Sequence, residues 1–158
     1  QVERCRNRIE APISRREGVK ASVLRDRIQK MAFEYAGPVR DGPSLEKALT
    51  EVERIKAKEM PLVCSESKDT VYNLEWMNSL QVENMLQVLE MVTRASLLRK
   101  ESRGAMYRRD YPSTDNKNWL RNIIIRQENG KMKLTAKPII VTKIKPPPRK
   151  VVPYWVPE

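Results

Sequence analysis

The stretch LQVENMLQVLEMVTRASLL, residues 80–98, decides the fold of this chain. If this stretch forms a helix, its apolar side chains surround most of the helix circumference. They leave one narrow polar stripe, formed by Glu83, Gln87, Glu90 and Arg94. A helix of this kind is usually central and packed from several directions. The pattern therefore predicts a long central helix over residues 73–103, with Gly104 as its left-handed C-terminal cap.

Two shorter amphipathic helices are predicted upstream of this central helix. The first covers residues 18–35, where apolar side chains recur at helical spacing: Val19, Leu24, Ile28, Met31 and Tyr35. The second follows the breaker sequence AGPVRDGPS, with Ser44 as its N-cap and Pro61 marking its end. Its expected buried stripe is Leu45, Leu49, Val52 and Ile55. Three such helices joined by short loops predict a mainly α fold, an antiparallel three-helix bundle.

The pattern changes to that of strands in NIIIRQENGKMKLTAKP, residues 122–138. Asn129-Gly130 lies between two alternating runs, which predicts a β-hairpin with a two-residue type I′ turn. Such a turn pairs Glu128 with Lys131, Ile125 with Leu134 and Ile123 with Ala136. A lone hairpin is marginal in water, so its apolar face should pack on the bundle or on another chain.

These patterns divide the chain into four parts. They are a connecting arm (1–17), the helical bundle (18–111), a loop with the β-hairpin (112–141), and an extended, basic, Pro-rich tail (142–158) that is either disordered or laid along a neighbour. The chain opens on Gln1 within the charged run QVERCRNRIE, which favours a piece of a longer polypeptide, cut by proteolysis or by design.

Composition excludes several classes of function. The chain of 158 residues has no His, which removes the commonest general base and disfavours a zinc site. Its five glycines build no Gly-rich phosphate loop, and no run of eighteen apolar residues could span a membrane. Cys5 and Cys64 fit a disulfide or a reducing compartment equally well. These residues predict no catalytic, cofactor-binding or metal-binding site in this chain.

The net charge of +11 comes from 31 basic and 20 acidic residues, so both signs are mixed along the sequence. No aromatic-studded basic face or nucleic-acid reading module is evident. The segment RKESRGAMYRRDYPSTDNKNWL, residues 99–120, nevertheless concentrates arginines just after the central helix. It suggests three alternatives: a nucleic-acid patch, a catalytic segment, or a docking surface.

This segment resembles the C-terminal region of the flavoprotein subunit of succinate dehydrogenase and fumarate reductase. That family carries a basic residue, Glu-Ser-Arg-Gly-Ala-His, an Arg, an Asp with an aromatic residue, an acidic cluster and a Trp. The matching positions are Arg99, Glu101, Ser102, Arg103, Gly104, Ala105, Arg108, Asp110, Tyr111, Asp115 and Trp119. Met106 replaces the family's His, and Asn116 replaces its second acidic residue. L-aspartate oxidase is a close sibling that the sequence DYP at 110–112 also suits.

The resemblance implies that this chain is the C-terminal helical domain of an FAD-dependent oxidoreductase that interconverts succinate and fumarate. FAD, substrate-binding and proton-delivering residues would belong to upstream domains. The expected partners are the upstream FAD-binding domain and an iron–sulfur subunit, without specific nucleic acid or a membrane span. The location would be cytoplasmic, or peripheral to the membrane through partner subunits. The resemblance leaves open the reaction's direction, the electron acceptor, the flavin linkage and the oligomeric state.

On this hypothesis the segment is a docking element, with Arg103 and Asp110 as candidate interface ion pairs. The residues of this candidate docking segment are Glu101, Ser102, Arg103, Gly104, Arg108, Asp110, Tyr111 and Trp119. A simpler alternative is a capped helix end followed by a loop. A third is a free-standing basic helical adaptor or nucleic-acid-binding module, which would use Arg4, Arg6, Arg8, Arg15, Arg16 and the basic residues of 143–150.

Overall fold

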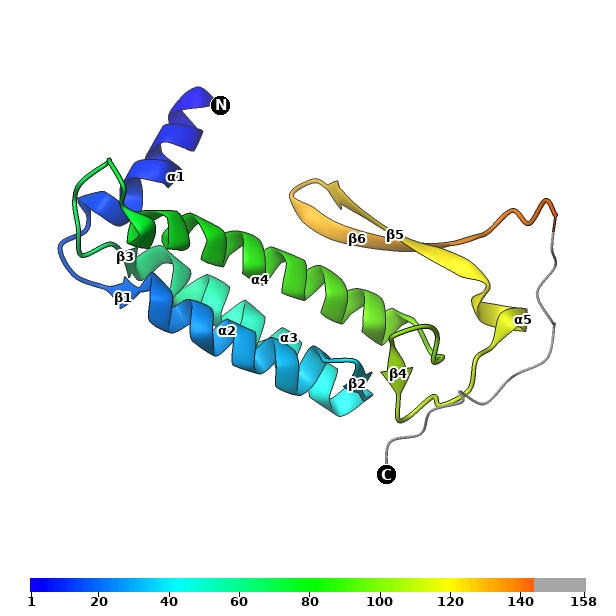
Figure 1. The fold of residues 1–158 in the computed structure, drawn as a ribbon. Coiled ribbons are helices and arrows are strands. Elements are labelled where there is room, and N and C mark those ends of the chain that lie inside the picture. Colours follow the sequence, from blue (N-terminus) through cyan, green and yellow to red (C-terminus); the bar gives the residue numbers. More distant parts are fainter. Residues whose placement is uncertain (144–158) are drawn as a thin grey trace.

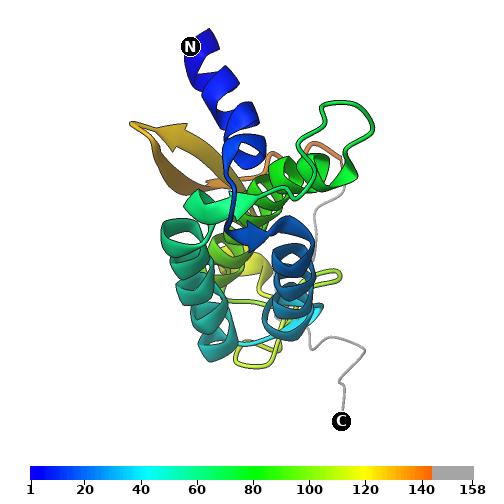
Figure 2. The same ribbon diagram turned by 90° about the vertical axis from the view of Figure 1, so that its left-hand side faces the viewer.

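The computed structural model describes residues 1–143 and shows a helical bundle followed by a separate hairpin (Figure 1). The main helices are α1 (Val2–Ser14), α2 (Ala21–Ala36), α3 (Gly42–Lys58) and α4 (Leu74–Leu98). Helices α2, α3 and α4 lie side by side and alternate in direction (Figures 1 and 2). The predicted mainly α class, with a three-helix bundle and a C-terminal hairpin, is confirmed. Of the predicted tail, residues 144–158 lie outside the described part of the chain.

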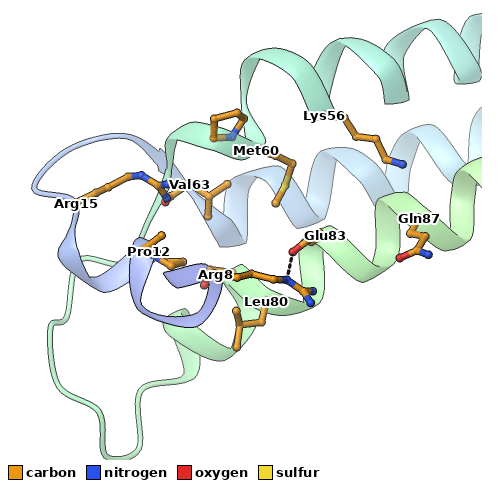
Figure 3. A pocket seen from close by; sticks show the side chains of 12 residues that line it. Arg8, Pro12, Arg15, Lys56, Met60, Val63, Leu80, Glu83 and Gln87 are labelled. Atoms are coloured by element: carbon orange, nitrogen blue, oxygen red, sulfur yellow. Dashed lines mark hydrogen bonds and ion pairs between the residues drawn. The ribbon is translucent and has the colours of Figure 1, made fainter. Parts of the chain in front are cut away.

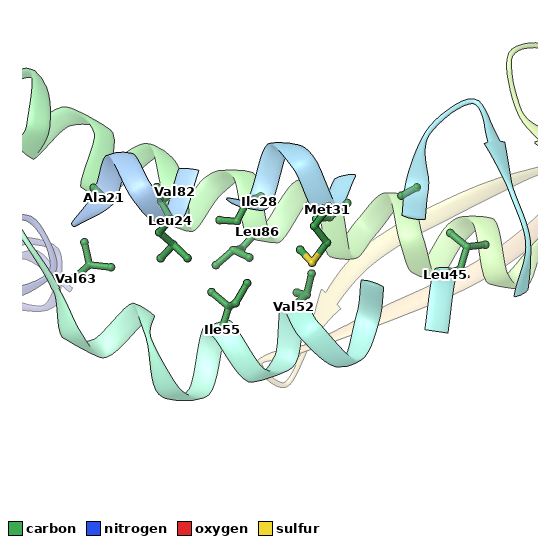
Figure 4. Packing of buried hydrophobic residues seen from close by; sticks show 12 residues of the cluster. Ala21, Leu24, Ile28, Met31, Leu45, Val52, Ile55, Val63, Val82 and Leu86 are labelled. Carbon is green, nitrogen blue, oxygen red and sulfur yellow. The ribbon is translucent and has the colours of Figure 1, made fainter. Parts of the chain in front are cut away.

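The bundle core lies where these three helices meet (Figure 4). Its fully or almost fully buried side chains are aliphatic and come from all three helices: Leu24, Ile28 and Met31 from α2, Leu45, Val52 and Ile55 from α3, and Val82, Leu86 and Leu89 from α4. Each fully buried side chain of this size stabilises the fold by roughly 1.5–3 kcal/mol relative to its exposed state. Leu49 is only half-buried, and Ala48 takes the expected place of that residue in the α3 stripe.

The N-terminal segment, predicted as a connecting arm, forms helix α1. Its apolar residues Val2, Cys5, Ile9 and Ile13 do recur at helical spacing, but Pro12 and the many charges made the segment read as an arm. Contacts with distant segments fix its position. The indole Nε1 of Trp76 donates to the Ile9 carbonyl at 2.7 Å, and the Ser65 amide donates to the Pro12 carbonyl at 2.8 Å. Helix α1 therefore lies against the start of α4. Its role as a connector to another domain stays a prediction.

The N-cap of α3 is Asp41, three residues before the predicted Ser44. The Asp41 carboxylate accepts a hydrogen bond from the Ser44 amide at 2.8 Å. Pro43 then occupies the first turn, where the missing amide hydrogen costs nothing. The prediction chose a good capping residue at the wrong position, since both Asp and Ser cap helices well.

Helix α4 begins after its N-cap Asn73 and ends at Leu98, five residues before the predicted end. Arg99 is extended, with φ −81° and ψ 111°, so Gly104 does not cap this helix. Gly104 instead has φ +57° in a turn where Arg103 and Met106 exchange backbone hydrogen bonds. Nor is α4 enclosed on all sides, because Val88 and Val92 are exposed.

Short parallel ladders join the loops at the two ends of the bundle. Strand β1 (Val19–Lys20) pairs with β3 (Val63–Cys64), which follows the short 3₁₀ helix η1 (Met60–Leu62). Strand β2 (Val39–Arg40) pairs with β4 (Tyr107–Arg108) at the other end. The second ladder holds the candidate docking segment against the α2–α3 loop.

The hairpin consists of β5 (Arg121–Glu128) and β6 (Lys131–Pro138), preceded by the single-turn helix α5 (Asn116–Trp119). Its register is the predicted one, including Ile125 opposite Leu134 and Ile123 opposite Ala136. The turn residues Asn129 and Gly130 have φ +51° and +77°, as a type I′ turn requires. The hairpin lies on the side of α4 away from α2 (Figures 1 and 2), and its apolar face stays half-exposed.

Candidate docking site

Glu101 is the centre of the candidate docking segment. Its side chain is completely buried, and its carboxylate accepts hydrogen bonds from three groups. The Arg99 guanidinium lies at 2.5 Å, that of Arg103 at 2.8 Å, and the Asp115 amide at 2.8 Å. A buried carboxylate is tolerated only when it is paired and fully hydrogen-bonded, which these partners achieve. Glu101 therefore ties the exit of α4 to the start of α5.

Ser102 and Arg108 hold the loop after Glu101 in place through hydrogen bonds. The Ser102 hydroxyl accepts from the Arg108 amide at 2.8 Å and lies 2.8 Å from the Tyr111 carbonyl, to which it donates. The Arg108 guanidinium is buried and donates to the backbone carbonyls of Ser96 and Arg99. Those carbonyls lack intrahelical partners at the end of α4, so Arg108 supplies the helix cap that was expected of Gly104.

Asp110 links Arg108 to the start of helix α3. Its carboxylate accepts from Arg108 and also from the Gly42 amide at 3.1 Å. The Arg108 hydrogen bonds hold the pKa of the Asp110 carboxyl below its ordinary value. A Cβ atom at Gly42 would lie 3.1 Å from an Asp110 oxygen, so the close approach favours glycine there. Neighbouring Arg40 donates to the Ser96 hydroxyl at 2.8 Å. Burial lowers the pKa of the Arg40 guanidinium.

Two of the aromatic residues in the segment, Tyr111 and Trp119, stack on arginines. The Arg99 guanidinium carbon lies 5.7 Å from the Trp119 ring centroid, and that of Arg108 lies 5.1 Å from the Tyr111 centroid. These are cation–π distances. Arg99 was not among the predicted docking residues, although it reaches Glu101, the Trp119 carbonyl and the Arg121 carbonyl. Its place two residues before Glu101 was the available sequence signal.

The structure thus brings the predicted docking residues into one interlocked cluster, with Gly104 at its exposed turn. Arg103 is paired with Glu101 and with the Asn116 side-chain oxygen at 2.6 Å, and Asp110 is paired with Arg108. Both candidate interface residues therefore already have partners within the chain. An ion pair from either residue to another domain stays a prediction.

A second candidate surface is a hollow between α2 and α4, which we call the apolar groove. Its volume is about 540 Å³. None of its lining residues is charged: Ile28, Gln29, Ala32 and Ala36 come from α2, and Gln81, Asn84, Met85, Val88, Leu89 and Val92 come from α4. Sequence reasoning placed α4 at the centre and so missed this uncovered face. The sequence signal for this face was the pair Val88 and Val92, which lie one helical turn apart on α4.

A third surface lies on the other side of α4 and shares no lining residue with the apolar groove. One hollow of about 440 Å³ lies between α1, the end of α3 and α4 (Figure 3). A second, of about 580 Å³, lies between α4 and the hairpin. Lys56 and Gln87 line both hollows, so the two are neighbours. We call the two hollows together the basic groove.

The N-termini of α3 and α4 and the apolar groove offer no site for the pyrophosphate of FAD. A pyrophosphate needs backbone amides at a free helix N-terminus or a cationic cradle. The first turns of α3 and α4 are occupied by the side chains of Asp41 and Asn73, and the apolar groove carries no cation. Within residues 1–143, no group of three His, Cys, Asp or Glu side chains could hold a metal ion. No helix in that same range is long and apolar enough to cross a membrane.

Comparison with known proteins identifies this fold. The model of the family described as the fumarate reductase flavoprotein C-terminus matches residues 25–151. A fumarate reductase flavoprotein subunit of Mycobacterium tuberculosis is 29% identical over 142 residues, covering 88% of this chain and 24% of that protein. The Mycobacterium smegmatis Sdh1 complex in its apo form contains a chain with a TM-score of 0.81 and 26% identity, over 89% of this chain and 24% of that one.

An E. coli quinol fumarate reductase shares the fold, with a TM-score of 0.79 at 20% identity over 94% of this chain and 25% of that one. The bundle with its hairpin is thus the C-terminal helical domain of a flavoprotein subunit. This chain belongs to the fumarate reductase flavoprotein C-terminal family. Fumarate reductase flavoprotein subunits match most of this chain, but the chain spans only about a quarter of their length.

Proposed function

We propose that this chain is the non-catalytic C-terminal domain of an FAD-dependent oxidoreductase and that it docks on the parent's FAD-binding domain. The uncovered apolar groove is the observation that carries this proposal. Val88 is 57% exposed in a groove without charged residues, and isolated domains rarely leave a continuous apolar face in water. A neighbouring domain that covers the groove would remove this surface from water and hold the bundle in place.

The parent reaction is proposed from the named relatives, which are fumarate reductase and succinate dehydrogenase flavoprotein subunits. The upstream part of the parent would bind FAD, whose flavin ring would accept a hydride from succinate or, when reduced, donate one to fumarate. L-aspartate oxidase stays an alternative parent. An iron–sulfur subunit is the proposed electron-transfer partner, and the proposed location is the cytoplasm or the membrane periphery.

The upstream coding DNA tests the parent assignment. We expect an open frame before Gln1 that continues into a strand, a Gly-x-Gly-x-x-Gly motif and a helix. The purified full-length protein should then contain FAD and reduce fumarate or oxidise succinate. A start codon directly before Gln1 would contradict the parent flavoprotein and favour the free-standing adaptor.

Two matched variants of the full-length protein test the docking face. Val88→Glu introduces a charge into the apolar groove, and Val23→Glu introduces it at a residue of similar exposure, 59%, outside that groove. We expect Val88→Glu to lower the Tm and the activity of the full-length protein, and Val23→Glu to leave both unchanged. In the 158-residue chain alone, both variants should change the free energy of unfolding by less than about 0.5 kcal/mol. Equal behaviour of the two in the full-length protein would place the docking face elsewhere.

A further inference from the structure

The walls of the apolar groove have the residue spacing of a helix-packing surface. Four of its α4 residues follow one another at intervals of four, three and four: Gln81, Met85, Val88 and Val92. Three of its α2 residues follow at intervals of three and four: Gln29, Ala32 and Ala36. Alternating steps of three and four residues keep side chains in one stripe, which is the pattern that helices use to pack along one another. Both walls therefore present a surface against which a further helix can pack.

The floor of the groove is apolar, and its α2 wall is low. Ile28 and Leu89 form the floor, and both are buried. Ala32 and Ala36 each carry only a methyl group, and helix axes approach most closely where the side chains at the contact are small. The groove can therefore take the larger apolar side chains of an occupant between the two helices.

The groove occupies the place of a fourth helix in the bundle. Helices α2, α3 and α4 stand at three corners when the bundle is seen from its end (Figure 2), and among the described residues none from α3 lines the groove. Helix α1 lies against the start of α4, and the hairpin lies on the side of α4 away from α2 (Figures 1 and 2). A helix laid in the groove would contact α2 and α4 and would complete a four-helix bundle.

Backbone hydrogen bonding favours a helix over an extended segment as the occupant. Both walls are the sides of helices, whose amides and carbonyls bond to one another within each helix. A strand in the groove would bury amides and carbonyls with few partners, because the described lining residues offer them only the side-chain amides of Gln29, Gln81 and Asn84. A helix satisfies its own backbone and presents only side chains to the groove.

We propose that an α-helix from the upstream part of the parent lies in the apolar groove and packs on α2 and α4 as a fourth helix of the bundle. This inference rests on the proposed function and names the element that covers the groove. Residues 81–92 of α4 extend about 17 Å at the helical rise, so about three turns of the occupant are in contact. Its contacting side chains should be apolar and recur every three or four residues, because no described lining residue carries a charge that could pair with a buried one.

A second copy of this chain fits the groove less well than a single helix. The copy would present either its own concave groove or a bundle surface carrying part of its net charge of +11. Two grooves facing each other would leave a void between them, and the side chains that line a void lose packing contacts. Like charge also opposes the association of two copies.

Photo-cross-linking in the purified full-length protein tests the proposal. A benzophenone amino acid replaces Gln81, Val88 or Val92 in three separate variants, and mass spectrometry locates the residue that each one captures. All three positions are exposed, so the replacement leaves the core intact. The matched control carries the same amino acid at Val23, which is 59% exposed on α2 outside the groove.

We expect the three probes to capture one upstream segment, at apolar positions on one face of a helix. Eleven residues separate Gln81 from Val92, so the residues captured by these two probes should lie about eleven apart in a helix. In an extended strand the same length covers only about five residues. The Val23 probe should not capture this segment.

The outcomes separate this inference from the proposed function. Capture of an upstream segment at a separation of about five residues, or at charged side chains, would contradict the helix and leave the docking of the upstream domain in place. Capture of no upstream segment by any groove probe would overturn both. A mixture of isotopically light and heavy protein detects a second copy, because a heavy–light cross-linked pair forms only between two molecules. Such a pair, or capture of residues 144–158 or of another polypeptide, would also overturn this inference.

Discussion

Arg108 and Asp110 form a two-point ion pair, with Nε–Oδ1 at 2.7 Å and Nη2–Oδ2 at 2.5 Å. The third guanidinium nitrogen caps the end of α4, and the Asp110 carboxylate also accepts from the Gly42 amide of α3. One residue pair thus joins the C-terminal end of α4 to the N-terminal end of α3. This polar contact supplements the apolar core, which reaches the same ends through Leu45 and Leu97.

Asp110→Asn should lower the free energy of unfolding at pH 7 by about 1–2 kcal/mol, because it weakens charge-assisted bonds that are partly exposed. The folded-state pKa of the Asp110 carboxyl is lowered. Its contribution is therefore present above the unfolded pKa and is lost as the pH falls through the lower, folded pKa. Denaturation at several pH values should show the two proteins converging in acid. A difference that stays constant with pH would contradict this role of the carboxylate.

Glu101→Gln should be more costly, by about 3–5 kcal/mol, because it leaves the guanidinium groups of Arg99 and Arg103 without a buried counter-charge. Urea unfolding of the chain measures this change. The matched control is Glu53→Gln, which removes an exposed carboxylate paired with Arg94 and should cost less than about 1 kcal/mol. Similar costs for the two variants would show that the Glu101 cluster does not hold the segment.

Leu86→Ala should lower the free energy of unfolding by about 2–5 kcal/mol, because this side chain is completely buried between α2, α3 and α4. Val88→Ala, two residues along the same helix, should change it by less than about 0.5 kcal/mol. Both are read from thermal or urea denaturation. In the full-length protein the Val88 variant should cost more than in the chain alone, if the apolar groove is covered there.

Gly130→Val should open the hairpin without unfolding the bundle. Gly130 has φ +77°, where a β-branched side chain costs more than the roughly 1–2 kcal/mol of an ordinary residue. NMR contacts between Ile125 and Leu134 should disappear, while the chemical shifts of the buried core residues of α2 and α3 stay unchanged. Asn129→Gly should preserve the hairpin, because glycine also adopts a positive φ. Persistent cross-strand contacts in Gly130→Val would contradict this reading of the turn.

The sequence by itself determined the helices and strands that depend on residues close together in the chain. The Asn129-Gly130 turn set the register of β5 and β6 residue by residue, because only a few side chains accept two successive positive φ angles. The apolar spacing of α2 and α3 predicted the buried face of the bundle, including Leu24, Ile28 and Ile55. The Glu-Ser-Arg-Gly-Ala motif also led to the family that the comparisons show.

Only the tertiary structure decided features that depend on residues far apart in the chain. The end of α4 is set by Arg108, which reaches back to the carbonyls of Ser96 and Arg99, so no local capping signal could locate it. The position of helix α1 is fixed by hydrogen bonds from Ser65 and Trp76, more than fifty residues away, to its carbonyls. The partners of Arg103 and Asp110, and the two grooves on either side of α4, likewise arise from packing. Hydrophobic periodicity shows which face of a helix is apolar, but the positions of the other helices decide how much of that face is covered.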